Sequence, residues 1–60
     1  MEVGQRWLFS IKMNDTKLFH YSGEILKIEG DLIYIFEQYK QTEVFFNRNY
    51  IISAEKLGDL

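Results

Sequence analysis

The chain has 60 residues, 47% of them hydrophobic, with a net charge of -2 and a pI near 5.2. A domain of this length buries only about 60% of the surface of its unfolded chain, so its core needs support from disulfides, a metal or oligomerisation. Because there is no cysteine and only one histidine, disulfides and zinc sites of the Cys/His kind are excluded, and we expect a homo-oligomer.

Alternation of large apolar residues predicts a first strand over residues 6–13. Trp7, Phe9, Ile11 and Met13 share one parity, so we expect these side chains to face the core. The sequence NDTK at residues 14–17 then favours a turn.

A second strand is predicted over residues 18–28, and its pattern changes phase part-way. Phe19 and Tyr21, before Gly23, have odd residue numbers, whereas Leu26 and Ile28, after it, have even ones. A bulge or sharp bend at Gly23 would re-aim the later side chains. The sequence EGD that follows predicts a tight hairpin whose glycine adopts a positive φ.

The third predicted strand, DLIYIFEQY at residues 31–39, carries large apolar side chains on both faces. A half-buried strand alternates apolar with polar residues, so one face of this strand is core and the other needs a partner. Parity favours the face of Ile33 and Ile35 as core, although the sequence leaves the choice open. The residues that parity assigns to the core are Phe9, Ile11, Ile33, Ile35 and Ile52.

The remaining elements are shorter. A turn at residues 39–42 leads to a fourth strand at 42–46, and a short turn or 3₁₀ step at 47–49 leads to a fifth strand at 50–53. The tail predicts one helical turn, with Ser53 as its N-cap and Gly58 as its stop. A rival interpretation makes residues 37–46 a helix, because Glu, Gln and Lys favour one.

These elements predict a single all-β domain over residues 1–60, a five-stranded, strongly curled and partly open barrel. The order of residues resembles a small SH3-like barrel of the Tudor type. VGQRW resembles its first strand, YSGEILKIEGD its G-x-I-x-x-I-x-G-D hairpin, and IFEQYKQTEV its F-x-D-Y-G-N-x-E segment.

The resemblance implies an aromatic cage that reads methylated Lys or Arg by cation–π attraction, with Phe36 and Tyr39 as cage residues. Three positions depart from the family's segment: Gln38 replaces its Asp, Lys40 its Gly and Gln41 its Asn. Lys40 beside a cage would repel a cationic ligand, so the departures weigh against methyl-lysine reading.

Aromatic residues and arginines are the candidate binding residues. A small barrel has too little interior for all of its aromatic side chains, so some of them lie outside and mark a binding surface. Two arginines could frame a groove for a carboxylate or phosphate. The candidate binding residues are Trp7, Tyr34, Phe36, Tyr39, Phe45, Arg6 and Arg48.

No catalytic residue, metal ligand or cofactor is predicted. His20 and Ser22 could share a strand face, but no nucleophile turn or glycine-rich oxyanion loop accompanies them. The acids lie at turns or alternating positions without the spacing of a calcium loop. We therefore expect a protein that is not an enzyme.

The first functional hypothesis is a binding module that self-associates and binds a host protein or a small anionic, nucleotide-like ligand. Abundant residues with AT-rich codons fit an AT-rich bacterium or one of its phages, and the small size of the module suits a phage-encoded antagonist of a host factor. The alternative is nucleic-acid binding, which the acidic net charge disfavours. The N-terminus lacks the features of a signal peptide and no apolar run approaches a membrane span, so we expect a cytoplasmic protein without a membrane partner.

Overall fold

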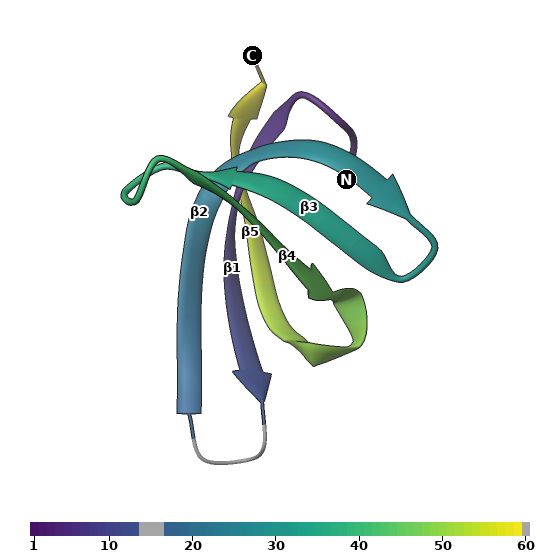
Figure 1. Ribbon diagram of the computed structural model, residues 1–60, viewed down its shortest axis with the longest axis vertical. Helices are drawn as coiled ribbons and strands as arrows, with labels where there is room; N and C mark the ends of the chain where they lie inside the picture. Colours follow the sequence, from purple (N-terminus) through teal and green to yellow (C-terminus); the bar gives the residue numbers. More distant parts are fainter. Residues whose placement is uncertain (14–16, 60) are drawn as a thin grey trace.

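The computed structural model describes residues 1–13 and 17–59, so the turn predicted at residues 14–17 lies largely outside the described residues. Five antiparallel strands form one sheet, which confirms the all-β prediction (Figure 1). The elements are β1 (Gln5–Met13), β2 (Lys17–Glu29), β3 (Leu32–Glu37), β4 (Thr42–Asn47), the 3₁₀ helix η1 (Arg48–Tyr50) and β5 (Ile51–Asp59). Their order in the sheet is β4-β3-β2-β1-β5, so β4 and β5 are its two edges.

β2 joins the two halves of the sheet, and it curves between them (Figure 1). Gly23 pairs with Trp7 of β1 on one side and with Glu37 of β3 on the other. A Cβ at this position would collide with the carbonyl oxygen of Phe36, so close approach of the two backbones requires glycine.

Of the two alternatives predicted at Gly23, a bulge or a sharp bend, the bulge is wrong in position. The register between β2 and β3 shifts between Ile25 and Lys27, which leaves Leu26 as the extra residue, 38% exposed. The change of phase therefore comes three residues after the glycine, and Ile25 stays in the core.

The core lies on the inner face of the sheet. Its buried side chains are Phe9, Ile11, Ile25, Ile33, Ile35 and Phe46. The rings of Phe9 on β1 and Phe46 on β4 meet edge to face with centroids 5.0 Å apart. These strands are three places apart in the sheet, about 14 Å if the sheet were flat. The sheet therefore bends so that β3 and β4 lie across β1 and β5 (Figure 1).

Burial settles which face of β3 is core. Ile33 and Ile35 are buried, whereas Phe36 on the opposite face is 39% exposed. The hairpin before β3 is also confirmed, because Gly30 has a φ of 58° at the first of its two turn residues, as in a type II′ turn. The rival helix over residues 37–46 is wrong, since that segment consists of the last residue of β3, a turn at 38–41 and the first five residues of β4.

Two predictions for the C-terminal part are wrong. Residues 51–59 form one strand instead of a short strand followed by a helical turn. Pairing with β1 satisfies the backbone of this segment, and an isolated helical turn has too few hydrogen bonds to compete. Ile52 is 59% exposed instead of core, because a register shift opposite Ser10 and Ile11 turns Ile51 toward the core in its place.

Candidate binding surface

An aromatic surface covers the outer face of β3 and β4. We call Tyr34, Phe36 and Phe45 the aromatic face. The register pairs Tyr34 with Phe45, and their rings stack with centroids 5.5 Å apart. Phe45 is 64% exposed although its neighbour Phe46 is buried, because successive side chains of a strand point to opposite faces. The face is therefore apolar, contiguous and open to solvent.

Charged side chains border the aromatic face on its β2 side. Lys27 pairs with Tyr34 in the register, and its ammonium lies 5.3 Å from the centre of the ring. The same ammonium forms an ion pair with Glu29 at 3.2 Å. An aromatic centre with a polar border has the composition of a protein interface.

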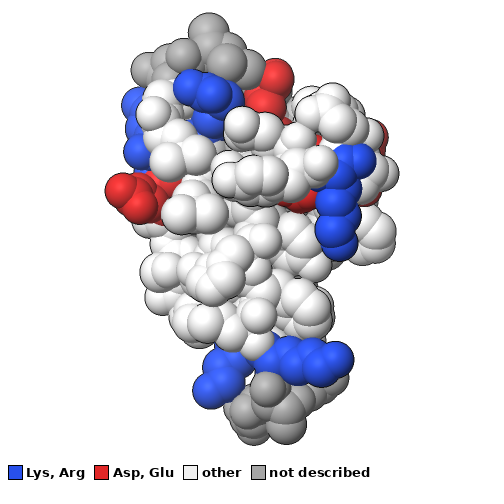
Figure 2. Space-filling view, turned by 90° about the vertical axis from the view of Figure 1, so that its left-hand side faces the viewer, with Lys and Arg blue, Asp and Glu red and all other residues white. Residues whose placement is uncertain are grey.

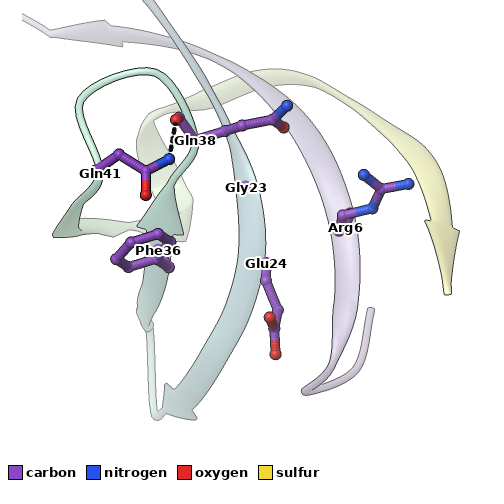
Figure 3. Close-up of a pocket in the computed structure, with 6 residues that line it drawn as sticks. All are labelled: Arg6, Gly23, Glu24, Phe36, Gln38 and Gln41. Carbon is purple, nitrogen blue, oxygen red and sulfur yellow. Dashed lines mark hydrogen bonds between the residues drawn. The ribbon is translucent and has the colours of Figure 1, made fainter. Parts of the chain in front are cut away.

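A pocket of about 210 Å³ opens beside the aromatic face, and Phe36 belongs to both. It is lined by Arg6, Gly23, Glu24, Phe36, Gln38 and Gln41 (Figure 3). The register aligns Arg6, Glu24 and Phe36 in one row across β1, β2 and β3. The carboxylate of Glu24 and the guanidinium of Arg6 point in different directions (Figure 3). The pocket thus offers a cation, an anion, an aromatic ring and two amides.

The turn between β3 and β4 is held by a buried carboxylate. Glu37 is only 3% exposed, and its two carboxylate oxygens accept hydrogen bonds from the N–H groups of Tyr39 at 3.0 Å and Lys40 at 2.8 Å. Gln41, with a φ of 55°, donates its side-chain amide to the carbonyl of Gln38 at 2.8 Å. This turn forms the upper wall of the pocket in Figure 3, and it leaves Tyr39 84% exposed.

The two predicted arginines lie in different places. The Nε of Arg6 is buried and has no hydrogen-bond partner among the side chains that the structure describes. Arg48 begins η1 and is exposed, and its N–H donates to the carbonyl of Asp31 at 2.7 Å. Only Arg6 lines the pocket, so the two arginines do not frame one groove.

Trp7 lies on the inner face and not with the other aromatic candidates. It is half-buried, packs against the core and stacks on Phe9 with centroids 6.3 Å apart. Its indole N–H donates to the side-chain oxygen of Gln5 at 3.0 Å. These contacts explain Trp7 as a structural residue at the border of the core.

His20 contacts a serine of β1 and not Ser22, which could share its face of β2. Its Nδ1 lies 3.0 Å from the hydroxyl of Ser10, the residue opposite it on β1, whereas Ser22 is buried. Residues 1–13 and 17–59 contain no group of three or more His, Cys, Asp or Glu side chains placed to hold a metal ion. None of the described residues belongs to a helix that could cross a membrane.

Basic side chains do not gather into one patch on the face shown in Figure 2. Lys and Arg lie toward its ends and one side, with a broad uncharged surface between them. Nucleic-acid binding depends on a basic surface that follows the phosphate backbone. This face does not have that arrangement.

Of the predicted binding residues, the structure places Tyr34, Phe36 and Phe45 on one face and Arg6 in the pocket, whereas three polar residues of the pocket were not predicted. Glu24, Gln38 and Gln41 carry no motif of their own. Glu37 had one usable signal, an acid just before a turn, where its carboxylate can accept backbone N–H groups. Comparisons with protein-family models, curated proteins and solved structures gave no match to this chain.

Proposed function

We propose that this protein is a nonenzymatic binding module that self-associates through the aromatic face. The observation that carries the proposal is the exposure of Phe45 and Phe36, 64% and 39%, on one contiguous surface. Burying such a surface against a second chain removes apolar area from water, which stabilises the complex by about 25 cal/mol per Å² of buried area. Because a chain of this size buries only a small core, that association adds to its stability.

The pocket beside the aromatic face is the basis of the second part of the proposed function, the binding of a partner or ligand. Arg6 can bind a carboxylate or phosphate, and Phe36 can pack against an apolar or ring-shaped part of the same ligand. We propose that the module binds a host protein or a small anionic, nucleotide-like ligand there. Action as a phage-encoded antagonist in the bacterial cytoplasm belongs to the same hypothesis.

For the fold we propose an SH3-like barrel of the Tudor type. The contact between Phe9 and Phe46 supports it, because it brings the inner faces of β1 and β4 together. The long curved β2, which pairs with β1 and then with β3, and the 3₁₀ turn before β5 support it as well. An experimental structure in which the inner faces of β1 and β4 pack against each other would test this partly open barrel.

Native mass spectrometry of the untagged protein tests the proposed function. We expect masses at a multiple of 7.2 kDa, and a shift to monomer in Phe45→Ser with an unchanged circular dichroism spectrum. Ile52→Ser is the matched control, since Ile52 is similarly exposed, at 59%, but lies on β5. This control should keep the oligomer.

Two results would contradict the proposal. A wild-type protein that stays monomeric at high micromolar concentration has no self-association to explain. An oligomer that Ile52→Ser dissociates and Phe45→Ser does not would place the interface on β5.

For the pocket, Arg6→Gln should abolish the added mass of any anionic ligand that copurifies with the wild type, while the oligomer persists.

A further inference from the structure

Two opposite charges line the pocket without neutralising each other. Arg6 and Glu24 are directly opposite in the register of β1 and β2, a position at which opposite charges commonly pair. They form no ion pair with each other, and their side chains point in different directions (Figure 3). The buried Nε of Arg6 also has no hydrogen-bond partner among the side chains that the structure describes. Both charges are therefore available to a ligand.

The pocket has an acceptor end and a donor end. The carboxylate of Glu24 only accepts hydrogen bonds, and it lies at the lower end of the pocket in Figure 3. The guanidinium of Arg6 and the side-chain amide of Gln38 lie toward the upper end, and both groups can donate. A ligand that matches this arrangement carries N–H donors at one end and an anion at the other.

Phe36 adds a flat apolar wall to the same row of residues. It is opposite Glu24 in the register of β2 and β3, and it is 39% exposed. Because neighbouring strands lie about 4.8 Å apart, the backbones of Phe36 and Arg6 are at most about 10 Å apart, two strands across the sheet. A planar base can stack on such a ring while a phosphate of the same molecule reaches the arginine.

We propose that the pocket binds a guanine nucleotide, with its base on Phe36, its donor edge on Glu24 and its phosphate on Arg6. This inference rests on the proposed binding of an anionic ligand in this pocket and names the class of that ligand. The donor edge of guanine faces away from its sugar, so the phosphate extends toward the opposite end, where Arg6 and Gln38 lie.

The carboxylate of Glu24 is what selects guanine. Among the four common RNA bases, guanine alone presents two adjacent donors, N1–H and the 2-amino group, which match the two oxygens of one carboxylate. Adenine and cytosine have a ring-nitrogen acceptor beside their amino group, and uracil has a carbonyl on each side of its N–H. These acceptors would face another acceptor at Glu24, which disfavours the three other bases.

The size of the pocket fits a single nucleotide that stays partly in solvent. Its volume of about 210 Å³ lies below the roughly 300–1,000 Å³ of pockets that enclose a drug-sized molecule. The base and its contacts with Phe36 and Glu24 therefore fill most of the space, and the phosphate lies at the mouth.

NMR titration of the labelled protein with GMP, IMP, AMP and guanosine tests the inference through their dissociation constants. IMP lacks only the 2-amino group, so it loses one of the two hydrogen bonds to Glu24 and should bind about tenfold more weakly than GMP. AMP places an acceptor against the carboxylate and should bind more weakly still. Guanosine lacks the phosphate, so losing the contact with Arg6 should also weaken it about tenfold.

Glu24→Gln is the decisive variant, because it keeps the size of the side chain and replaces one acceptor by a donor. An amide with one donor and one acceptor matches adenine, so the preference should move from GMP toward AMP. Arg6→Gln should weaken GMP and AMP by a similar factor and leave their ratio unchanged. The matched control is Glu43→Gln, which makes the same change on the other side of Phe36, outside the pocket, and should keep the preference for GMP.

The outcomes separate this inference from the proposed function. Equal affinities for GMP and AMP, or a preference that Glu24→Gln leaves unchanged, overturn guanine recognition, while an anion site stands if Arg6→Gln weakens both nucleotides. A preference lost in Glu43→Gln and kept in Glu24→Gln overturns it as well. If none of the four probes binds at millimolar concentration, the inference is rejected, and the oligomer masses still test self-association independently.

Discussion

The two edges of the sheet, β4 and β5, are built in opposite ways. β4 keeps one register with β3 and contributes Phe46 to the core. β5 pairs with β1 across two register shifts, carries Glu55 and Lys56 along its length, and leaves Ile52 exposed. Bulges and charged residues are the devices by which edge strands resist pairing. β5 therefore has both of these devices, whereas β4 keeps a single register and carries one charged residue, Glu43.

The largest difference between the two edge strands should appear in the free energy of unfolding when one large apolar side chain is removed from each. Phe46→Ala empties a site in the core, so we expect the free energy of unfolding to fall by about 3–5 kcal/mol. Ile52→Ala removes a mostly exposed side chain and should change it by less than about 0.5 kcal/mol. Urea unfolding at low protein concentration measures both. Equal losses would mean that β5 is as integral to the core as β4.

The buried carboxylate that holds the turn before β4 gives the next largest effect. Glu37→Ala leaves the N–H groups of Tyr39 and Lys40 without their acceptor, so we expect a loss of about 1–3 kcal/mol. Glu43→Ala is the control, because this exposed carboxylate has no hydrogen bond among the described residues. Thermal unfolding of the monomeric variants compares them. A loss no larger than that of the control would show that the turn does not depend on Glu37.

Amide hydrogen exchange should reveal the open edge directly. Arg48 donates its N–H to Asp31, and bonded pairs alternate with non-bonded pairs along the β3–β4 register, so in the monomer the N–H groups of Val44 and Phe46 face β3 and those of Glu43 and Phe45 face away from it. We expect protection to alternate along β4 by more than about tenfold. Raising the protein concentration should protect the outward amides if a strand of another chain pairs with this edge. Uniform exchange along β4 in the dilute sample would contradict the assignment of outward groups.

The smallest effect concerns the border of the aromatic face. Lys27→Met removes both the contact with the Tyr34 ring and the exposed ion pair with Glu29, so stability should fall by less than about 1 kcal/mol. Thermal unfolding at low and high salt measures the change, and high salt should reduce the difference from wild type. A larger loss would mean that Lys27 packs more tightly than its exposure indicates.

Local patterns made some elements predictable. The alternation of apolar residues on β1 identified Phe9 and Ile11 as core, and the glycine of the β2–β3 hairpin predicted its tight turn. The aromatic face was predictable because the third strand has apolar residues of both parities. In each case the information lies in residues close together in the chain.

Long-range pairing decided the features that the sequence did not predict. The bulge at Leu26 depends on the register between β2 and β3, and the extension of β5 to Asp59 depends on β1 being present as its partner. The pocket combines residues of β1, β2 and the turn after β3, which the sequence separates.

The sequence by itself determined that this protein is all-β, which residues alternate, and that one strand has a second apolar face. The tertiary structure decided which face is buried, where the sheet bends and which strands are its edges. The physical reason is that strand periodicity is a local property of side chains, whereas register, burial and edges arise only when distant strands share hydrogen bonds.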